Sequence, residues 1–220
     1  MITQLPPVDI VGHQSSGLGG PDHPMRLVTR RAAGLSPGGW TDDVRGRVTD
    51  LFDGLAAEWH TRTSPGRTAV VVDALERGLP ATTGGLAVEV GSGIGSYSAL
   101  LAERFDVVVA LDLALEMLRL APAGPARRVR ADGATLPLAD GVASAVVLVN
   151  AFLFPAEVDR VLASGGVVVW VNSSGEETPI HLTPAEVADA LPGAWEGTAS
   201  RAGAGLWCVL KRAGEPRRPS

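Results

Sequence analysis

The chain has 220 residues, enough for one sizeable domain with room for an appendage. Its hydrophobic fraction of 45% and charged fraction of 20% are ordinary for a globular protein. A formal net charge of −5 argues against a nucleic-acid-binding surface, which needs a basic patch. We expect no membrane span and no signal peptide, because no run approaches 18 apolar residues and the N-terminus lacks a basic region before an apolar one. The single Cys208 cannot form an internal disulfide, which favours a reducing, cytoplasmic location.

Three stretches of different character follow one another along the chain. Residues 1–40 are rich in proline and glycine and show no sustained period, so we expect an irregular N-terminal arm. Residues 41–80 predict a helical cap: Thr41 is a good N-cap before apolar residues at helical spacing, and Ser64 followed by proline begins a second helix. Residues 81–213 are predicted to form the core domain.

The most informative segment is a glycine-rich turn between the apolar run 86–90 and a helix-like stretch. A turn in this context lets a ligand approach the backbone and points N–H groups of the helix at it. The dinucleotide fingerprint wants glycine at the first, third and sixth positions, but Ser96 stands sixth from Gly91. Glu89 lies two residues before the first glycine. The residues expected to approach a ligand through their backbone are Gly91, Ser92, Gly93 and Gly95.

Polar residues also follow three further strand-like runs. The run 105–112 ends in Asp112, 126–130 is followed by Asp132 and Gly133, and 142–149 is followed by Asn150. A carboxylate at the tip of the second strand of a doubly wound sheet can bind both hydroxyls of a ribose. The order of these features predicts a nucleotide-type ligand at the strand ends.

The segment from Glu89 through the three glycines resembles motif I, E/D-x-G-x-G-x-G, of the class I S-adenosylmethionine (SAM) dependent methyltransferases. Residues 160–166 are similar to the family's "R-V-L-x-P-G-G" turn, with Ser164 in place of proline, and residues 51–59 echo the "F-D-x-L-A-x-x-W" opening of the small-molecule members grouped as type 11. The resemblance covers roughly residues 50–212. It implies an α/β fold: a Rossmann-like seven-stranded sheet with helices on both faces and an antiparallel C-terminal strand pair, here preceded by the irregular arm.

The resemblance also implies SAM as the cofactor and a role for each residue at the strand ends. Glu89 would orient the ammonium group, and the turn would contact the methionyl part and approach the ribose. The remaining roles fall to Asp112 for the ribose hydroxyls, Asp132 and the N–H of Gly133 for adenine, Leu113 and Met117 on either side of the adenine ring, and Asn150 on the methyl-transfer side. Several of these residues also have a purely structural interpretation: a helix or turn cap for Asp112 and Asp132, core packing for Met117, and turn formation for Asn150.

Two departures from the family pattern concern the surroundings of the pocket. The 14 residues between Asn150 and Gly165 leave room for only an abbreviated helix. Ala114 replaces a residue whose hydroxyl can cap the next helix. The sequence assigns no catalytic base, although His181, Glu176 and Glu177 are candidates because the loop after the fifth strand edges the pocket in this fold. Histidine spacing and a single cysteine give no metal site.

Three functions are compatible with these patterns. The first, which we predict, is SAM-dependent methylation of a small molecule. The second is a SAM-fold protein without catalysis that binds or assembles, favoured by the short segment after Asn150. The third is a nicotinamide-dependent oxidoreductase, which the glycine spacing and the antiparallel pair disfavour. We expect neither nucleic acid nor membrane as a partner. The acceptor, the methylated atom (O, N, C or S), the oligomeric state and the role of residues 1–40 stay open.

Overall fold

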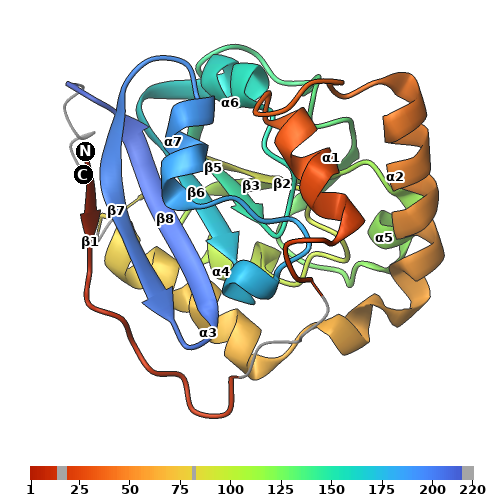
Figure 1. Cartoon of the computed structure of the whole chain (residues 1–220), viewed down its shortest axis with the longest axis horizontal. Coiled ribbons are helices and arrows are strands. Elements are labelled where there is room, and N and C mark those ends of the chain that lie inside the picture. Colours follow the sequence, from red (N-terminus) through yellow and green to blue (C-terminus); the bar gives the residue numbers. More distant parts are fainter. Residues whose placement is uncertain (14–18, 81–82, 215–220) are drawn as a thin grey trace.

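The computed structural model describes residues 1–13, 19–80 and 83–214. Its centre is an eight-stranded sheet with the order β1-β7-β8-β6-β5-β2-β3-β4 (Figure 1). The strands are β1 (Ile2–Gln4), β2 (Leu86–Val90), β3 (Val107–Asp112), β4 (Arg127–Arg130), β5 (Ala143–Val149), β6 (Leu162–Asn172), β7 (Trp195–Ala202) and β8 (Gly205–Arg212). β8 runs antiparallel to both β6 and β7, and the other neighbours pair in parallel. The predicted α/β fold with its antiparallel C-terminal pair is confirmed.

Helices lie on both sides of this sheet (Figure 1). They are α1 (Pro24–Ala32), α2 (Asp42–Leu55), α3 (Pro65–Asp73), α4 (Ser98–Ala102), α5 (Leu115–Leu120), α6 (Pro155–Val161) and α7 (Pro184–Ala190), with the 3-10 turns η1 (Ala56–Arg62) and η3 (Gly175–Glu177) and the π-helical turn η2 (Ala74–Gly78). The two helix starts predicted from sequence are confirmed. The Thr41 side chain accepts from the N–H of Val44, and that of Ser64 accepts from the N–H of Arg67. Across the described ranges no helix has the length and apolar character needed to span a membrane.

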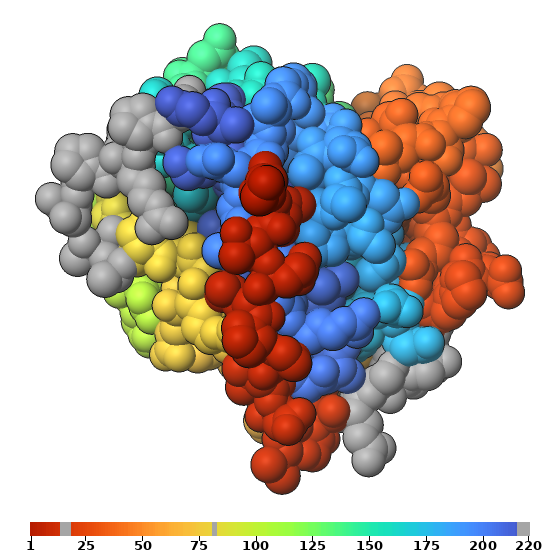
Figure 2. Space-filling model, turned by 60° about the vertical axis from the view of Figure 1, so that its left-hand side comes forward, coloured from red at the N-terminus to blue at the C-terminus, as the bar shows by residue number. Residues whose placement is uncertain are grey.

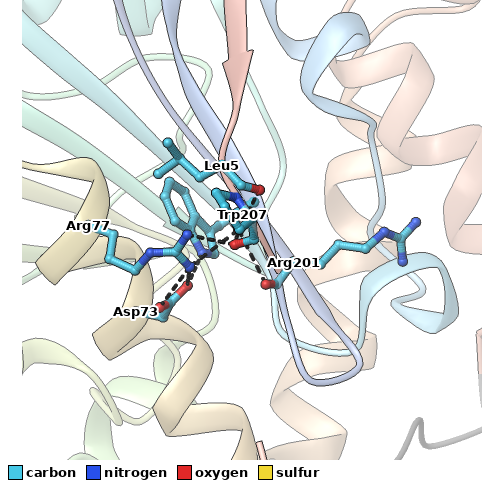
Figure 3. A network of polar contacts seen from close by, with 7 residues as sticks. Leu5, Asp73, Arg77, Arg201 and Trp207 are labelled. Atoms are coloured by element: carbon cyan, nitrogen blue, oxygen red, sulfur yellow. Dashed lines mark hydrogen bonds and ion pairs between the residues drawn. The ribbon is translucent and has the colours of Figure 1, made fainter. Parts of the chain in front are cut away.

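The N-terminal segment is more regular than its composition predicts. It contributes α1 and also β1, which pairs with β7 and makes the sheet eight-stranded instead of the expected seven. In the space-filling view the first residues of the chain, in red, lie along the blue C-terminal part (Figure 2). Beyond β1 the extended chain is held by contacts with the C-terminal part of the sheet. The N–H of Leu5 donates to the carbonyl oxygen of Ala199 in β7. Arg77 donates to the carbonyl oxygen of Pro6 at 2.7 Å and to Asp73, which also accepts from the Trp207 indole (Figure 3). Residues 14–18 of the predicted arm lie outside the described residues.

Three hydrophobic clusters place the helices. One face of the sheet packs against α6 and α7, and the other packs against α3, η2 and α4. A third cluster joins α1 and α2 to Phe152, Phe154 and Ile180, which lie in the loops after β5 and β6. Since those loops leave the carboxyl ends of their strands, α1 and α2 form a cap over that edge of the sheet.

The topology fixes where a ligand can bind. The chain runs from β2 outward to β3 and β4, then returns to β5 on the other side of β2. In open α/β sheets ligands bind outside the carboxyl ends of the strands where the order reverses in this way. Glu89 near the end of β2 and Asn150 directly after β5 flank that point.

Candidate functional site

A cavity of about 410 Å³ opens at the carboxyl ends of β2, β3 and β5, beneath the cap. This size is typical of small-molecule sites. The sequence-predicted residues that line it are Glu89, Gly91, Ser92, Gly93, Asp112, Leu113, Met117, Asp132, Gly133 and Asn150. Gly95, the remaining one, does not line the cavity; its N–H donates to the carbonyl oxygen of Ser92 at 2.9 Å and closes the turn.

The glycine turn approaches the cavity in a backbone conformation that side chains disfavour. Gly91 has φ +68° and Gly93 has φ +55°. A Cβ on Gly91 would lie 2.7 Å from the Cβ of Ala151, and one on Gly93 would lie 3.2 Å from Nε1 of Trp59. The Oγ of Ser92, between them, is buried and has no hydrogen-bond partner among the described residues. An unpaired buried hydroxyl is costly, so the turn presents a polar group that suits a ligand.

Glu89 is a buried acid, with 2% of its surface exposed. The Oγ of Ser98, in the first turn of α4, donates to its Oε2 at 2.5 Å. Burial raises the pKa of Glu89 to about 7, although this hydrogen bond opposes the shift. The carboxyl group can therefore take or release a proton near neutral pH, when a cation arrives beside it.

Asp112 connects the glycine turn to the end of β3. Its Oδ2 accepts from the N–H of Gly93 at 2.7 Å, and its Oδ1 accepts from the N–H of Ala114 at 2.8 Å. Burial raises the pKa of Asp112, opposed by these two backbone hydrogen bonds. Each carboxylate oxygen keeps a second acceptor site. The contact with Ala114 is a local turn contact and not a helix N-cap, because α5 has Ala114 as its N-cap and no side-chain cap. The remaining acceptor sites leave the ribose role open.

Asp132 is engaged by the cap. The indole N–H of Trp40 lies 3.1 Å from each of its two carboxylate oxygens, and the Arg45 guanidinium lies 3.6 Å away. Its Oδ1 also accepts from the N–H of Ala134 at 2.9 Å, as a turn cap does. Next to it, a Cβ on Gly133 would lie 2.8 Å from the Phe154 ring, so glycine keeps this wall open.

The other predicted residues combine structural and lining positions. Met117 is buried, at 1% exposure, in a cluster with Ala56 and Ala114, yet it also lines the cavity. Asn150 has φ +52°, as a turn former can, and its side-chain amide exchanges hydrogen bonds with Ser173 at 2.8 and 2.9 Å. The structural interpretations of these two residues are therefore confirmed, and their contact with a cofactor stays a prediction.

Sequence reasoning missed most of the cap side of the cavity. The missed lining residues include His23, Trp40, Trp59, Arg62, Arg67, Phe152 and Phe154. His23 belongs to the segment expected to be irregular; it is the N-cap of α1, its Nδ1 accepting from the N–H of Met25 at 3.1 Å. One sequence signal for this side of the cavity was available: three aromatic residues, Trp40, Phe152 and Phe154, lie outside the strands. In the structure the Trp40 ring packs against both Phe rings, with centroid distances of 5.4 Å to Phe152 and 5.0 Å to Phe154.

The cap also supplies a hydrogen-bond acceptor for the first turn of α5, where Ala114 has no hydroxyl group to do so. α5 begins without a side-chain cap of its own, as the sequence departure predicts. In place of that hydroxyl, Oδ1 of Asp53 in α2 accepts from the N–H of Glu116 at 2.8 Å. This bond ties the cap to the helix that follows β3.

None of the three candidate bases occurs among the described residues that line the cavity. His181 is buried with its ring bonded to the carbonyl oxygen of Gly175 at 3.1 Å, and burial lowers its pKa. Glu176 is ion-paired with Arg201 on the surface. Glu177 does not line the cavity either.

Comparison with known proteins agrees with this geometry. Residues 88–170 match the model of a family described as a methyltransferase domain. The complex of DhpI with SAH is 20% identical with a TM-score of 0.62, over 80% of this chain and 100% of that one. SAM-dependent methyltransferases from Thermotoga maritima (15% identity, TM-score 0.57, 74% of this chain and 99% of that one) and Aquifex aeolicus (16%, 0.55, 71% and 98%) also match.

Other matches are partial. The chain spans 59% of the protein solved with the Haloferax volcanii methyltransferase activator Trm112 and 50% of YcgJ from Bacillus subtilis. No curated protein matches by sequence. The resemblance to the class I SAM-dependent methyltransferases is confirmed, over residues 88–170 by the family model and over most of the chain by the fold.

Proposed function

We propose that this protein transfers a methyl group from SAM to a small-molecule acceptor. One observation carries the proposal. At the reversal of strand order, a glycine turn with left-handed backbone, the unpartnered buried hydroxyl of Ser92 and the carboxylates of Glu89 and Asp112 line one cavity. This combination suits a ligand with an amino-acid end and a ribose.

The residues present fit SAM group by group. Glu89, once ionised, is a counter-ion for an ammonium group, and Ser92 offers a hydroxyl to the amino-acid end. The second acceptor sites of Asp112 suit two ribose hydroxyls. Asp132 would accept from an adenine amino group while sharing its oxygens with Trp40, and Leu113 and Met117 would pack beside the ring.

SAM supplies a methyl group already activated on a sulfonium, so the protein needs to position the reactants more than to change their chemistry. The strand-end residues, whose backbone positions are fixed, hold SAM. The aromatic cap residues, Trp40, Trp59 and Phe152 among them, exclude water from the cavity. Positioning of this kind can lower a barrier by about 7–11 kcal/mol.

The test is methyl transfer itself. The purified protein is incubated with SAM labelled on the methyl group and a panel of small metabolites bearing O, N, S and carbon nucleophiles. We expect labelled product from at least one acceptor, with equimolar S-adenosylhomocysteine (SAH). Tight SAH binding without transfer to any acceptor would favour the non-catalytic binding protein, and binding of NAD in preference to SAH would favour the oxidoreductase.

A further inference from the structure

Two arginines lie side by side on the cap side of the cavity. Arg62 is the last residue of η1, and Arg67 lies in the first turn of α3. Both line the cavity, and Nη1 of Arg67 donates to the carbonyl oxygen of Arg62 at 2.5 Å. The short connection between η1 and α3 therefore presents two guanidinium groups to one space.

Neither guanidinium is neutralised within the described part of the chain. No carboxylate there lies within ion-pair distance of Arg62 or Arg67, and Nε of Arg62 is buried without a hydrogen-bond partner. Arginines that do pair with carboxylates are Arg30, Arg45, Arg47, Arg77, Arg119, Arg160, Arg201 and Arg212. A buried donor without an acceptor is costly, so Arg62 is poised for an acceptor that the described residues do not supply, and Arg67 adds a second unneutralised charge beside it.

The surroundings reinforce the positive potential. The Arg62 guanidinium lies over the Trp59 ring, 5.7 Å from its centroid, which orients the side chain. The first turn of α3 has no acidic residue, so the positive end of that helix is not offset. The acids across the cavity have hydrogen-bond partners of their own, Glu89 in Ser98 and Asp112 in two backbone N–H groups, and neither is ion-paired with these arginines.

We propose that Arg62 and Arg67 form an anion-binding site for the methyl acceptor, and that the acceptor carries a carboxylate or a phosphate-type group. The planar donor fork of arginine matches both of these anions. This inference rests on the proposed function, since an acceptor has to approach a cofactor that bears a sulfonium. A negatively charged acceptor is attracted both by the arginine pair and by the sulfonium of the cofactor.

The experiment uses inorganic phosphate as the probe. Phosphate is titrated calorimetrically into the full-length protein saturated with SAH, and into Arg62→Gln, Arg67→Gln and Arg62→Lys. We expect binding to the parent, at least about tenfold weaker binding to each Gln variant, and an intermediate loss in Arg62→Lys, which keeps the charge without the fork. Arg127→Gln removes the same charge from an exposed position on β4 and serves as the matched control, with no change expected.

The same variants identify the source of the anion. SAH contains the amino-acid carboxylate of the cofactor, and 5′-methylthioadenosine lacks it. Unchanged SAH affinity in the Gln variants supports the acceptor site and shows that the variants fold. If Arg62→Gln weakens SAH tenfold and leaves 5′-methylthioadenosine unaffected, the guanidinium groups hold the cofactor, and our assignment is wrong. Phosphate binding that is absent from the parent, or equal in parent and variants, also overturns it.

The two proposals fail separately. If the parent binds neither SAH nor 5′-methylthioadenosine, the proposed function fails. In that case phosphate titration of the ligand-free protein, with the same variants of Arg62 and Arg67, still decides whether an anion site exists.

Discussion

The two walls of the cavity are built in different ways. The strand-end wall consists of the glycine turn and the acids Glu89 and Asp112, whose positions are set by backbone hydrogen bonds and left-handed φ angles. The cap wall consists of side chains such as Trp40, Trp59 and Arg62, placed by helix packing and ring contacts. In the proposed function the first wall binds SAM and the second binds the methyl acceptor.

The largest loss of ligand affinity is expected for a substitution at Gly93, in the strand-end wall. In Gly93→Val we expect SAH affinity to fall more than about 100-fold, because the new side chain meets Trp59 in the cavity and the residue has φ +55°. Gly141→Val is the matched control, since Gly141 has φ +64° and open space around its Cβ position. Both variants should lose about 1–2 kcal/mol of stability. Calorimetry with SAH should then separate them, and equal affinities would show that the turn is not a ligand loop.

The next largest effect is expected at Asp112. Asp112→Asn leaves one acceptor and places an amide donor toward a backbone N–H, so we expect SAH to bind about 10- to 150-fold more weakly. The unliganded protein should also lose stability. Asp106→Asn is the control, because its Oδ2 accepts from the N–H of Gly85 at 2.6 Å without lining the cavity. Similar SAH affinities in the two variants would leave Asp112 with a structural role only.

Glu89 should make ligand binding depend on pH. In the ligand-free protein the Glu89 carboxyl group has a pKa of about 7, and an ammonium group binds the ionised form of that carboxyl group. SAH affinity should therefore fall up to about tenfold per pH unit below 7 and level off above it. The folded state also keeps a proton that an unfolded chain, with a pKa of 4.5, has released, so the stability contribution of Glu89 falls as pH rises from about 4.5 to 7. Both dependences should be flat in Glu89→Gln; a parent-like pH profile there would assign them to another group.

The smallest effect is expected on the cap wall. Trp40→Phe keeps the packing against Phe152 and Phe154 but loses the hydrogen bond to Asp132, so we expect a loss of about 1 kcal/mol in the free energy of unfolding by urea. SAH affinity should change less than about threefold, since the carboxylate is freed for the ligand. Trp195→Phe, whose indole bonds the carbonyl oxygen of Pro192 away from the cavity, should cost similar stability. A tenfold loss of SAH affinity in Trp40→Phe alone would make Trp40 a direct ligand contact.

The same contrast explains what the sequence could predict. The strand-end wall was predictable because Glu89 and the glycines are neighbours in the chain, and because strand ends carry their acids at fixed places. The cap wall was not, because Trp40 meets Asp132 across 92 residues, and apolar side chains at helical spacing are ordinarily core. β1 was missed for a related reason: three residues, Ile2–Gln4, become a strand only by pairing with β7, near the other end of the chain.

The candidate bases in the loop after β6 lie away from the cavity for a tertiary reason as well. His181 follows a polar segment, as pocket residues in loops often do. In the fold its ring turns to the carbonyl oxygen of Gly175 and is buried. The pattern of residue types in that loop does not specify which side chains face the cavity.

The central claim is that this cavity binds SAM, and calorimetric titration of the unmodified protein with SAH tests it most directly. We expect one site per chain with a Kd of about 1 μM, roughly −8 kcal/mol, and no heat from NAD under the same conditions. Ligand at 100 times that Kd should add about 2.7 kcal/mol to the free energy of unfolding. No heat with SAH, together with a melting temperature that millimolar SAH leaves unchanged, would contradict the claim.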